Sequence, residues 1–319
     1  TFKNYNIDLG SNKKVTLLEP RNVEDGYLVE SGFVTSNQNI DIPNSDSVWS
    51  VIGKDELTNQ SSIKLTWTNK QGITFEKEIS LDEKYLFTIK QSVINSTNNK
   101  YDFYTYGQII RNKIPEISNF YILHEGLIAT LDDELIEEDY DDIQDKKFSR
   151  TAQKGWLGVG DKYWITSLIP PREKEFKTTF DYKKKFRANF IATEPLKLDS
   201  NAKIEEEFQV IIAAKRVDII DGYAETLNID KFDLAIDWGF LYFITKPLFF
   251  GIDYFFKQLG NYGLAIIAIT ICIRLAFFPL ANFSFRSMAK MKALQPEMVR
   301  LKDLHKDDKM KLQQEMMAL

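Results

Sequence analysis

Short stretches of alternating apolar and polar residues dominate positions 1–237, and turn-forming residues separate them. Positions 63–67 alternate, reach the turn-forming sequence Asn69-Lys70-Gln71-Gly72 and continue as alternating residues at 73–76, a pattern that predicts a β-hairpin. No long helical period interrupts this region. It is therefore predicted to be mainly β, an all-β sandwich of many strands. Further stretches that alternate in the same way are 85–89, 186–190 and 208–212.

A dense acidic run lies inside this region, with nine carboxylates between positions 132 and 145. Clustered carboxylates can bind calcium, but the spacing and central glycine of an EF-hand loop are absent. The run is therefore expected to be a solvated loop.

The pattern changes at Trp238, after which positions 238–260 are rich in Phe, Tyr, Leu and Ile. The charged residues Lys246, Asp253 and Lys257 are spaced by seven and four, so on a helix they form one narrow stripe. Asp253 also precedes Lys257 by four, the favoured order for a helical ion pair. An apolar helix with a thin polar stripe is typical of an amphipathic helix in the membrane interface, and a core helix packed on the β domain is the alternative.

The amphipathic helix should start near Lys246-Pro247 and end near Gly260-Asn261.

A transmembrane helix is predicted next, at 261–284. Positions 263–283 are apolar apart from Arg274, and as a helix they would be about 31 Å long, which matches the hydrocarbon core. A buried soluble helix rarely stays apolar on every side for so long.

Arg274 is the one charge in this span and lies near its centre. A charge at that depth costs on the order of 2.5–3.5 kcal/mol on insertion scales. Thr270 lies one turn earlier on the same side of the helix. The two residues predict a polar strip that faces protein or water, although Arg274 could instead reach the interface or pair with an acid on another helix.

Charge is distributed unevenly around the span. The net charge is −5 overall, +3 over 284–319 and +2 over 238–283, which leaves −10 for 1–237. Arg286, Lys290 and Lys292 follow the span directly, and such residues stay on the cytoplasmic side. The β domain is therefore expected outside the cytoplasm, which is the periplasm in a bacterium with two membranes.

The tail, 285–319, continues with a helical pattern in which Met288, Met291 and Met298 share an apolar stripe with several leucines. Lys306-Asp307-Asp308 interrupts the pattern, so a cytoplasmic helical hairpin is predicted. Methionine makes such a surface adaptable to varied partners. The stripe could equally be the internal seam of the hairpin.

Candidate catalytic chemistry is sparse. The chain has two histidines, His124 and His305, far apart in sequence, and its one cysteine, Cys272, lies in the predicted span. No His/Cys metal cluster or Cys–His nucleophile pair can be assembled from them, and no nucleotide-binding motif is present. Neither a metal nor a cofactor is expected, and the chain does not read as an enzyme.

The membrane-proximal motifs resemble those of the bacterial YidC/Oxa/Alb family of membrane protein insertases. The match is specific over about 225–319 and looser before it. The motifs that carry it are Ile273-Arg274-Leu275-Ala276-Phe277-Phe278-Pro279-Leu280, Ser287-Met288-Ala289-Lys290-Met291, Leu294-Gln295-Pro296 and Gln314-Glu315-Met316-Met317-Ala318-Leu319, then Asp237-Trp238-Gly239-Phe240-Leu241, Pro247-Leu248, Gly260-Asn261-Tyr262-Gly263, Lys154-Gly155-Trp156-Leu157 and Ile169-Pro170.

The resemblance implies a periplasmic β-supersandwich similar to sugar mutarotases, an amphipathic helix on the periplasmic face and a multi-pass inner membrane protein. Arg274 and Thr270 would line a hydrophilic groove that receives polar segments of nascent membrane proteins. The implied partners are nascent membrane proteins and the lipid bilayer, with Sec translocon subunits, the signal recognition particle pathway and the ribosome, but no nucleic acid directly. It also implies a span before Thr1 and more spans after Leu319, so that the chain is a fragment.

Two other functions stay open at this stage. The β domain could be a membrane-anchored carbohydrate-binding or mutarotase-like domain, for which His124 would be the histidine available on the periplasmic side. It could also be a structural docking module for the secretion translocon, which its acidic surface would suit.

Overall fold

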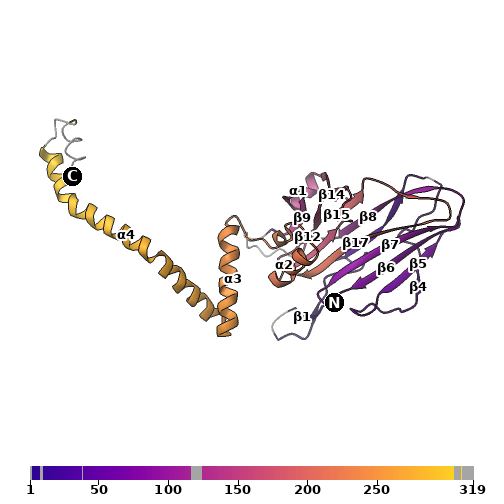
Figure 1. The fold of residues 1–319 in the computed structure, drawn as a ribbon, viewed down its shortest axis with the longest axis horizontal. Helices are drawn as coiled ribbons and strands as arrows, with labels where there is room; N and C mark the ends of the chain where they lie inside the picture. Colours follow the sequence, from indigo (N-terminus) through magenta and orange to yellow (C-terminus); the bar gives the residue numbers. More distant parts are fainter. Residues whose placement is uncertain (1, 8–9, 38, 116–123, 305–309, 311–319) are drawn as a thin grey trace. The chain divides into compact units, whose positions relative to one another are not determined.

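The computed structural model describes residues 2–7, 10–37, 39–115, 124–304 and 310. The chain divides into two compact units, Thr1–Asp237 and Trp238–Leu319. The first unit is built mainly of strands, with a few short helices, and the second unit of helices (Figure 1).

Nine antiparallel strands form the larger sheet of the first unit, in the order β10-β9-β12-β13-β17-β7-β6-β5-β4. A separate small sheet pairs β1 with β2. The strands of the nine-stranded sheet are β4 (Ser50–Ile52), β5 (Ile63–Thr68), β6 (Ile73–Leu81), β7 (Leu86–Asn95), β9 (Gly126–Leu131), β10 (Glu134–Asp139), β12 (Gly155–Gly160), β13 (Trp164–Ile169) and β17 (Lys203–Ala214), and those of the small sheet are β1 (Phe2–Asn6) and β2 (Lys14–Val15).

The second layer is a smaller antiparallel sheet centred on β8. Residues 106–111 of β8 pair with β15 along one edge and with β3 along the other. Beyond β8, the only backbone bridge of β3 in the described chain joins Tyr27 to Glu19, so most of its outer edge is unpaired. The strands are β3 (Tyr27–Thr35), β8 (Tyr101–Arg111), β11 (Phe148–Ala152), β14 (Phe176–Tyr182), β15 (Phe186–Ala192) and β16 (Leu196–Leu198).

The hairpin predicted at 63–76 is confirmed. β5 pairs with β6 out to Thr68 opposite Thr74. The Asn69 side-chain oxygen accepts the backbone N–H of Gln71 and of Ile73, at 3.0 and 2.8 Å. Gly72 takes the left-handed φ of +85° that the turn needs. The other alternating stretches lie in β7, β15 and β17, and the mainly β sandwich is confirmed.

Alternation along the strands sends every second side chain into the core between the sheets. Val210 and Ile212 of β17 point into this core, whereas the intervening Ile211 points to the outer surface of the nine-stranded sheet. There it packs with Trp156 under the helix α2 (Val217–Thr226) and the short 3₁₀ helix η1 (Phe232–Ala235). All three hydrophobic clusters consist of residues below position 237, so the first unit contains its complete core and is expected to fold as a domain.

The expected solvated loop at 132–145 is wrong. The run forms β10 and the helix α1 (Tyr140–Asp145), with Ile136, Tyr140 and Ile143 buried. Apolar residues spaced between the carboxylates give the segment one buried side while the acids point to solvent. The helices α1 and α2 were not predicted, because they are short and each buries only two or three side chains.

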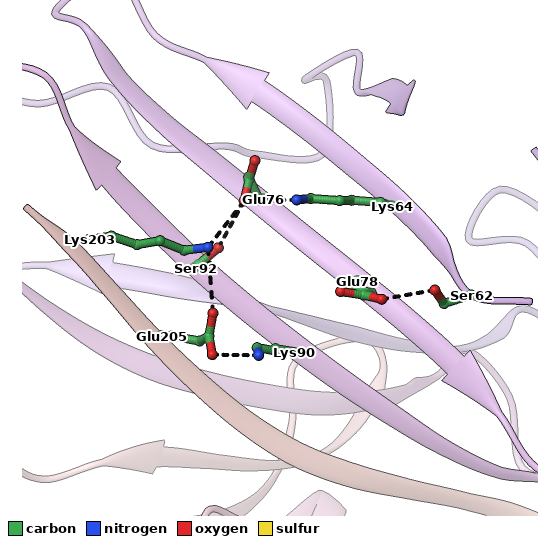
Figure 2. A network of polar contacts seen from close by, with 8 residues as sticks. All are labelled: Ser62, Lys64, Glu76, Glu78, Lys90, Ser92, Lys203 and Glu205. Carbon is green, nitrogen blue, oxygen red and sulfur yellow. Dashed lines mark hydrogen bonds and ion pairs between the residues drawn. The ribbon is translucent and has the colours of Figure 1, made fainter. Parts of the chain in front are cut away.

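The part of the outer surface that α2 leaves uncovered carries a network of charged and hydroxyl side chains, drawn in Figure 2. Glu76 on β6 contacts Lys64 on β5 at 3.3 Å and Lys203 on β17 at 3.5 Å. Glu205 pairs with Lys90 on β7 at 2.5 Å. Two of these pairs join neighbouring strands and the Glu76–Lys203 pair reaches across β7, so the network supports the register of the sheet.

The second unit consists of α3 (Tyr242–Leu259) and α4 (Tyr262–Leu304). α3 starts four residues before the expected Lys246-Pro247, so Pro247 lies inside its first turns rather than at its start. Its end at Gly260 agrees with the prediction. Gly260 adopts a left-handed φ of +66° and donates its N–H to the carbonyl of Phe256, at 2.8 Å.

Candidate functional site

α3 begins in an aromatic cluster around Lys246. The Lys246 ammonium lies 5.7 Å from the Trp238 ring and 5.6 Å from the Tyr242 ring. Phe249 packs edge-on against Trp238 at 5.6 Å. The Thr245 hydroxyl donates to the Trp238 carbonyl at 2.8 Å, which ties the residues before the helix to its first turn. This end of the helix is amphipathic, with an aromatic body and a cation.

Further along α3, Lys257 and Asp253 form the i,i+4 ion pair at 2.7 Å. α3 packs on α4 where Gly251 meets Ile269, since a Cβ at position 251 would lie only 2.8 Å from the Ile269 Cδ1 atom. The Phe256 ring also stacks on another aromatic ring, that of the first residue of α4, at 3.9 Å across the turn between the helices. No side chain of α3 is fully buried within the chain. Its aromatic surface is therefore available to lipid or to another protein.

α4 is 43 residues long, about 64 Å at 1.5 Å per residue, and so extends well beyond a hydrocarbon core of about 30 Å. Its start is capped by the side chain of Asn261, which accepts the backbone N–H of Leu264 at 3.2 Å. Within the described residues α4 is the one helix long and apolar enough to cross a membrane, and its apolar window is almost wholly exposed.

Arg274 and Thr270 lie on the same side of α4, one turn apart. The Thr270 hydroxyl donates to the Ile266 carbonyl at 2.7 Å, so its hydrogen bond is satisfied within the helix. Arg274 is exposed, and in the described ranges no carboxylate lies within 4 Å of it. The structure leaves the guanidinium available to a group outside these residues.

The stripe of Met288, Met291 and Met298 lies on the same helix, with exposed fractions of 51%, 70% and 38%. At 100° per residue the three fall within about 80° of one another. α4 runs through position 285 without a break, so the first arm of the expected hairpin continues the span. The turn expected at 306–308 lies outside the described residues.

His124 is held by its neighbours in the first unit. Its ring contacts Asp139 at 3.2 Å through Nδ1 and the Leu127 carbonyl at 3.2 Å through Nε2. It does not line the cleft described below. In the described ranges no three His, Cys, Asp or Glu side chains are close enough to hold a metal ion.

The first unit also has an open cleft of about 450 Å³ that was not predicted from the sequence. Its wall includes Lys77, the middle of three alternate positions on β6 whose neighbours, Phe75 and Ile79, are apolar. The alternation predicted at 73–76, if continued by one residue, would place Lys77 on the same side as Phe75. A lysine at an inward-facing position of a strand was the available signal.

Comparison with known proteins places the chain in a family. Residues 1–250 match the model described as the YidC periplasmic domain, and residues 254–319 match that of the 60Kd inner membrane protein. The chain is 71% identical over 319 residues to the membrane protein insertase YidC of Pelagibacter ubique (strain HTCC1062), covering 100% of this chain and 57% of that protein. The insertase YidC of Rickettsia bellii (strain OSU 85-389) is 39% identical over 327 residues, with 100% and 58% covered.

Solved structures give a weaker likeness. A galactose mutarotase related enzyme of Lactobacillus acidophilus has a TM-score of 0.39 at 11% identity, covering 51% of this chain and 70% of that one. A galactose mutarotase-like protein of Lactobacillus casei ATCC 334 has a TM-score of 0.39 at 9% identity, covering 51% and 72%. TM-scores below 0.5 carry no argument about activity.

The sequence matches thus cover both units, while the chain spans a little over half the length of these curated relatives. The chain belongs to the YidC family of membrane protein insertases, which are inner membrane proteins.

Proposed function

We propose that the protein inserts nascent membrane proteins into the bacterial inner membrane and assists their folding there. Family membership supports this, and one observation on this chain carries it. Its single span-capable helix holds an arginine near the middle of the apolar segment, with no carboxylate within 4 Å in the described ranges. Charges inside membrane segments are costly and usually mark a pathway.

Arg274 and Thr270 would line a hydrophilic groove in the membrane, completed by helices beyond this chain. A fixed positive charge in a medium of low dielectric constant attracts acidic or polar tails of a substrate. A wet groove also shortens the hydrocarbon that such a tail must cross. Burial of about 20 apolar residues of the substrate can then drive transfer without nucleotide hydrolysis.

The charges beside the span support an orientation with the β domain in the periplasm and the C-terminal part of α4 in the cytoplasm. Cysteines at the exposed Lys100 and Lys302 would test it once Cys272 is replaced. A thiol reagent that does not cross membranes should label position 100 from the periplasmic side and position 302 only after permeabilisation. The reverse pattern would overturn the orientation.

α3 would lie in the interface on the periplasmic face of the inner membrane, with its aromatic residues against lipid. A nitroxide at Phe249 should then be quenched by a lipid-phase reagent and one at Asp253 by an aqueous reagent. Equal access of both reagents to both positions would favour a core helix.

The Met288, Met291 and Met298 stripe would serve cytoplasmic partners. The wider partners that family membership suggests are Sec translocon subunits, the signal recognition particle pathway and the ribosome.

The groove is tested by cysteine accessibility in the whole protein. Cys272 is an internal control, because two residues after Thr270 it lies about 200° around the helix. A cysteine at position 270 or 274, with Cys272 replaced, should react with a water-soluble thiol reagent from the cytoplasmic side. Native Cys272 should not react. An unreactive position 274 would contradict the groove and leave Arg274 a structural residue.

The role of the charge is tested by substitution. Arg274→Lys keeps the charge but loses the planar fork, so it should retain more insertion of a substrate with an acidic tail than Arg274→Ala does. A substrate with a neutral tail is the control and should separate the two variants less. Equal insertion of the acidic tail by both variants would show that the charge does not attract it.

A further inference from the structure

An open cleft of the β domain lies between its two layers. Its walls are formed by the inward-facing positions of β6, β7 and β17 and by the unpaired edge of β3. Most of the side chains along these walls are apolar, among them Phe87, Ile89 and Val210. The cleft of about 450 Å³ is therefore large enough for a small apolar ligand or a few residues of a peptide.

Lys77 stands in this apolar wall. Its ammonium donates to the Ser31 carbonyl on β3 at 2.9 Å and lies 5.6 Å from the Trp49 ring. No carboxylate is within 4 Å of it among the described residues. An ammonium has three N–H donors, so two are left without an acceptor in the described part of the chain. Its withdrawal from solvent lowers the pKa of Lys77 to about 8, which leaves it mostly charged at neutral pH.

Gln91 is the second unsatisfied group. It lies on β7, is 1% exposed, and shares a small hollow of about 30 Å³ with Lys77 and Trp49. Its Oε1 atom has no hydrogen-bond partner, and its amide nitrogen makes only a long contact of 3.5 Å with the Gly32 carbonyl. A buried acceptor without a donor destabilises the fold, and a bound N–H group would recover that loss.

A hollow that shares residues with the cleft has an excess of positive charge from Lys183 and Lys185, because its two arginines are each paired with a carboxylate. Arg21, which pairs with Glu30, lines both the cleft and this hollow of about 370 Å³. Lys183, Lys185 and Arg187 line the hollow alone. A local positive potential of this kind draws anions towards the cleft.

We propose that this cleft binds an apolar peptide through a carboxylate, which pairs with Lys77, while a neighbouring backbone N–H of the peptide donates to Gln91. The apolar walls hold the ligand's side chains. One lysine matches a monoanion better than a phosphate dianion, whose second charge would be desolvated without a partner. A fatty acid has the carboxylate and the apolar chain but no N–H, so it would leave Gln91 unsatisfied.

Photolabelling of the whole chain in detergent micelles tests the proposal, because the labelled residues are identified directly. The probe is an N-acetylated tripeptide, Leu-photoleucine-Leu, with a free C-terminal carboxylate. Peptide mapping should find the label on residues that line the cleft. Unlabelled acetyl-Leu-Phe-Leu should compete at least about tenfold better as the acid than as the C-terminal amide, since a charge-assisted pair of this kind contributes about 1.5–3 kcal/mol.

The variants separate the two contacts. Lys77→Met should lower labelling about tenfold, whereas Lys90→Met, which removes an equal charge from the outer surface of the sheet, should leave it unchanged. Gln91→Met should weaken competition by the peptide acid severalfold and leave competition by decanoate unchanged. Far-UV circular dichroism checks that each variant is folded.

Three results would overturn the proposal. The amide could compete as well as the acid, which needs no variant and so does not depend on folding. The label could map outside the cleft, or the labelling yield could decrease by the same factor in Lys77→Met and Lys90→Met. Decanoate could compete better than the peptide acid with no effect of Gln91→Met, in which case the ligand is a fatty acid and not a peptide.

Discussion

Replacing Lys77 with methionine should make the β domain more stable, although it removes the ammonium on which ligand binding is proposed to depend. The side chain is surrounded by apolar residues, and its only direct polar partner in the described chain is the Ser31 carbonyl. Methionine has a similar length and no charge to desolvate. The change therefore removes an electrostatic cost while keeping most of the packing.

The size of the gain follows from the pKa. Withdrawal from solvent lowers the pKa of Lys77 from 10.5 to about 8. A difference of about 2.5 corresponds to a ceiling of about 3.4 kcal/mol, at 1.36 kcal/mol per pKa unit. The cleft is open to water, and the substitution also loses the Ser31 hydrogen bond and the Trp49 contact. We expect a net gain of about 1–2 kcal/mol at pH 7.

The gain should also depend on pH. Below pH 8 the folded domain carries a protonated Lys77 that it disfavours. As pH rises from 8 towards 10.5, the folded state releases this proton before the unfolded state does, so the parent domain becomes more stable. The variant has no such group, so the gap between the two proteins should narrow. Other titratable groups lie near Lys77, on the cleft walls or on the same side of the sheet. Arg21 pairs with Glu30 and Glu206 pairs with Lys174, while burial raises the pKa of Tyr106.

Urea unfolding of residues 1–237, followed by far-UV circular dichroism at pH 7 and pH 10, measures both effects. Lys90→Met is the matched control, because Lys90 is on the outer surface and Glu205 raises its pKa. That variant should be slightly less stable than the parent. A Lys77→Met domain that is less stable at pH 7, or a gain that is the same at both pH values, would refute the argument.

Three further changes test other parts of the structure. Burial raises the pKa of Glu76, but Lys64 and Lys203 together hold it below its ordinary value of 4.5. Glu76→Gln should therefore cost about 1 kcal/mol at pH 7 in urea unfolding, and the cost should shrink as the pH falls below 4.5; a cost that stays the same as the pH falls would contradict this. Trp156→Ala should cost about 3–5 kcal/mol, since the side chain is fully buried under α2; a loss below 1 kcal/mol would show that this cluster is not a core. Gly251→Leu should lower the crosslinking yield of a cysteine pair placed across the α3–α4 contact at Ile269, and an unchanged yield would show that close approach is not needed.

The architecture of the β domain follows from features visible in the sequence. The turn at Asn69–Gly72 combines a side chain that caps the turn with a glycine in a left-handed conformation, and both are local properties. The order of strands in the two sheets is not local. β17 pairs with β7 more than 100 residues earlier, and nothing in either strand specifies that partner. The short α1 was missed because its carboxylates hid the spacing of Tyr140 and Ile143.

The candidate site was predictable where it depends on one helix. Arg274 stands out because a single charge interrupts an apolar span, and no tertiary information is needed to see it. Lys77 does not stand out in the same way, since lysine is common in strands with one solvated side. Only the pairing of β6 with both neighbours, and the nearness of β3, show that its side of the strand faces a cleft.

The two cations share a property that sets them apart from the lysines of the outer surface. Lys64, Lys90 and Lys203 each contact a carboxylate, in a place where water would have stabilised them anyway. Lys77 and Arg274 lie in apolar surroundings, and within the described residues neither has a carboxylate within 4 Å. Selection for stability alone would favour an apolar residue at both positions, because a charge without a partner in such a place only costs free energy. The functions proposed above would supply that partner, an acidic group of a bound peptide for Lys77 and an acidic group of a substrate for Arg274.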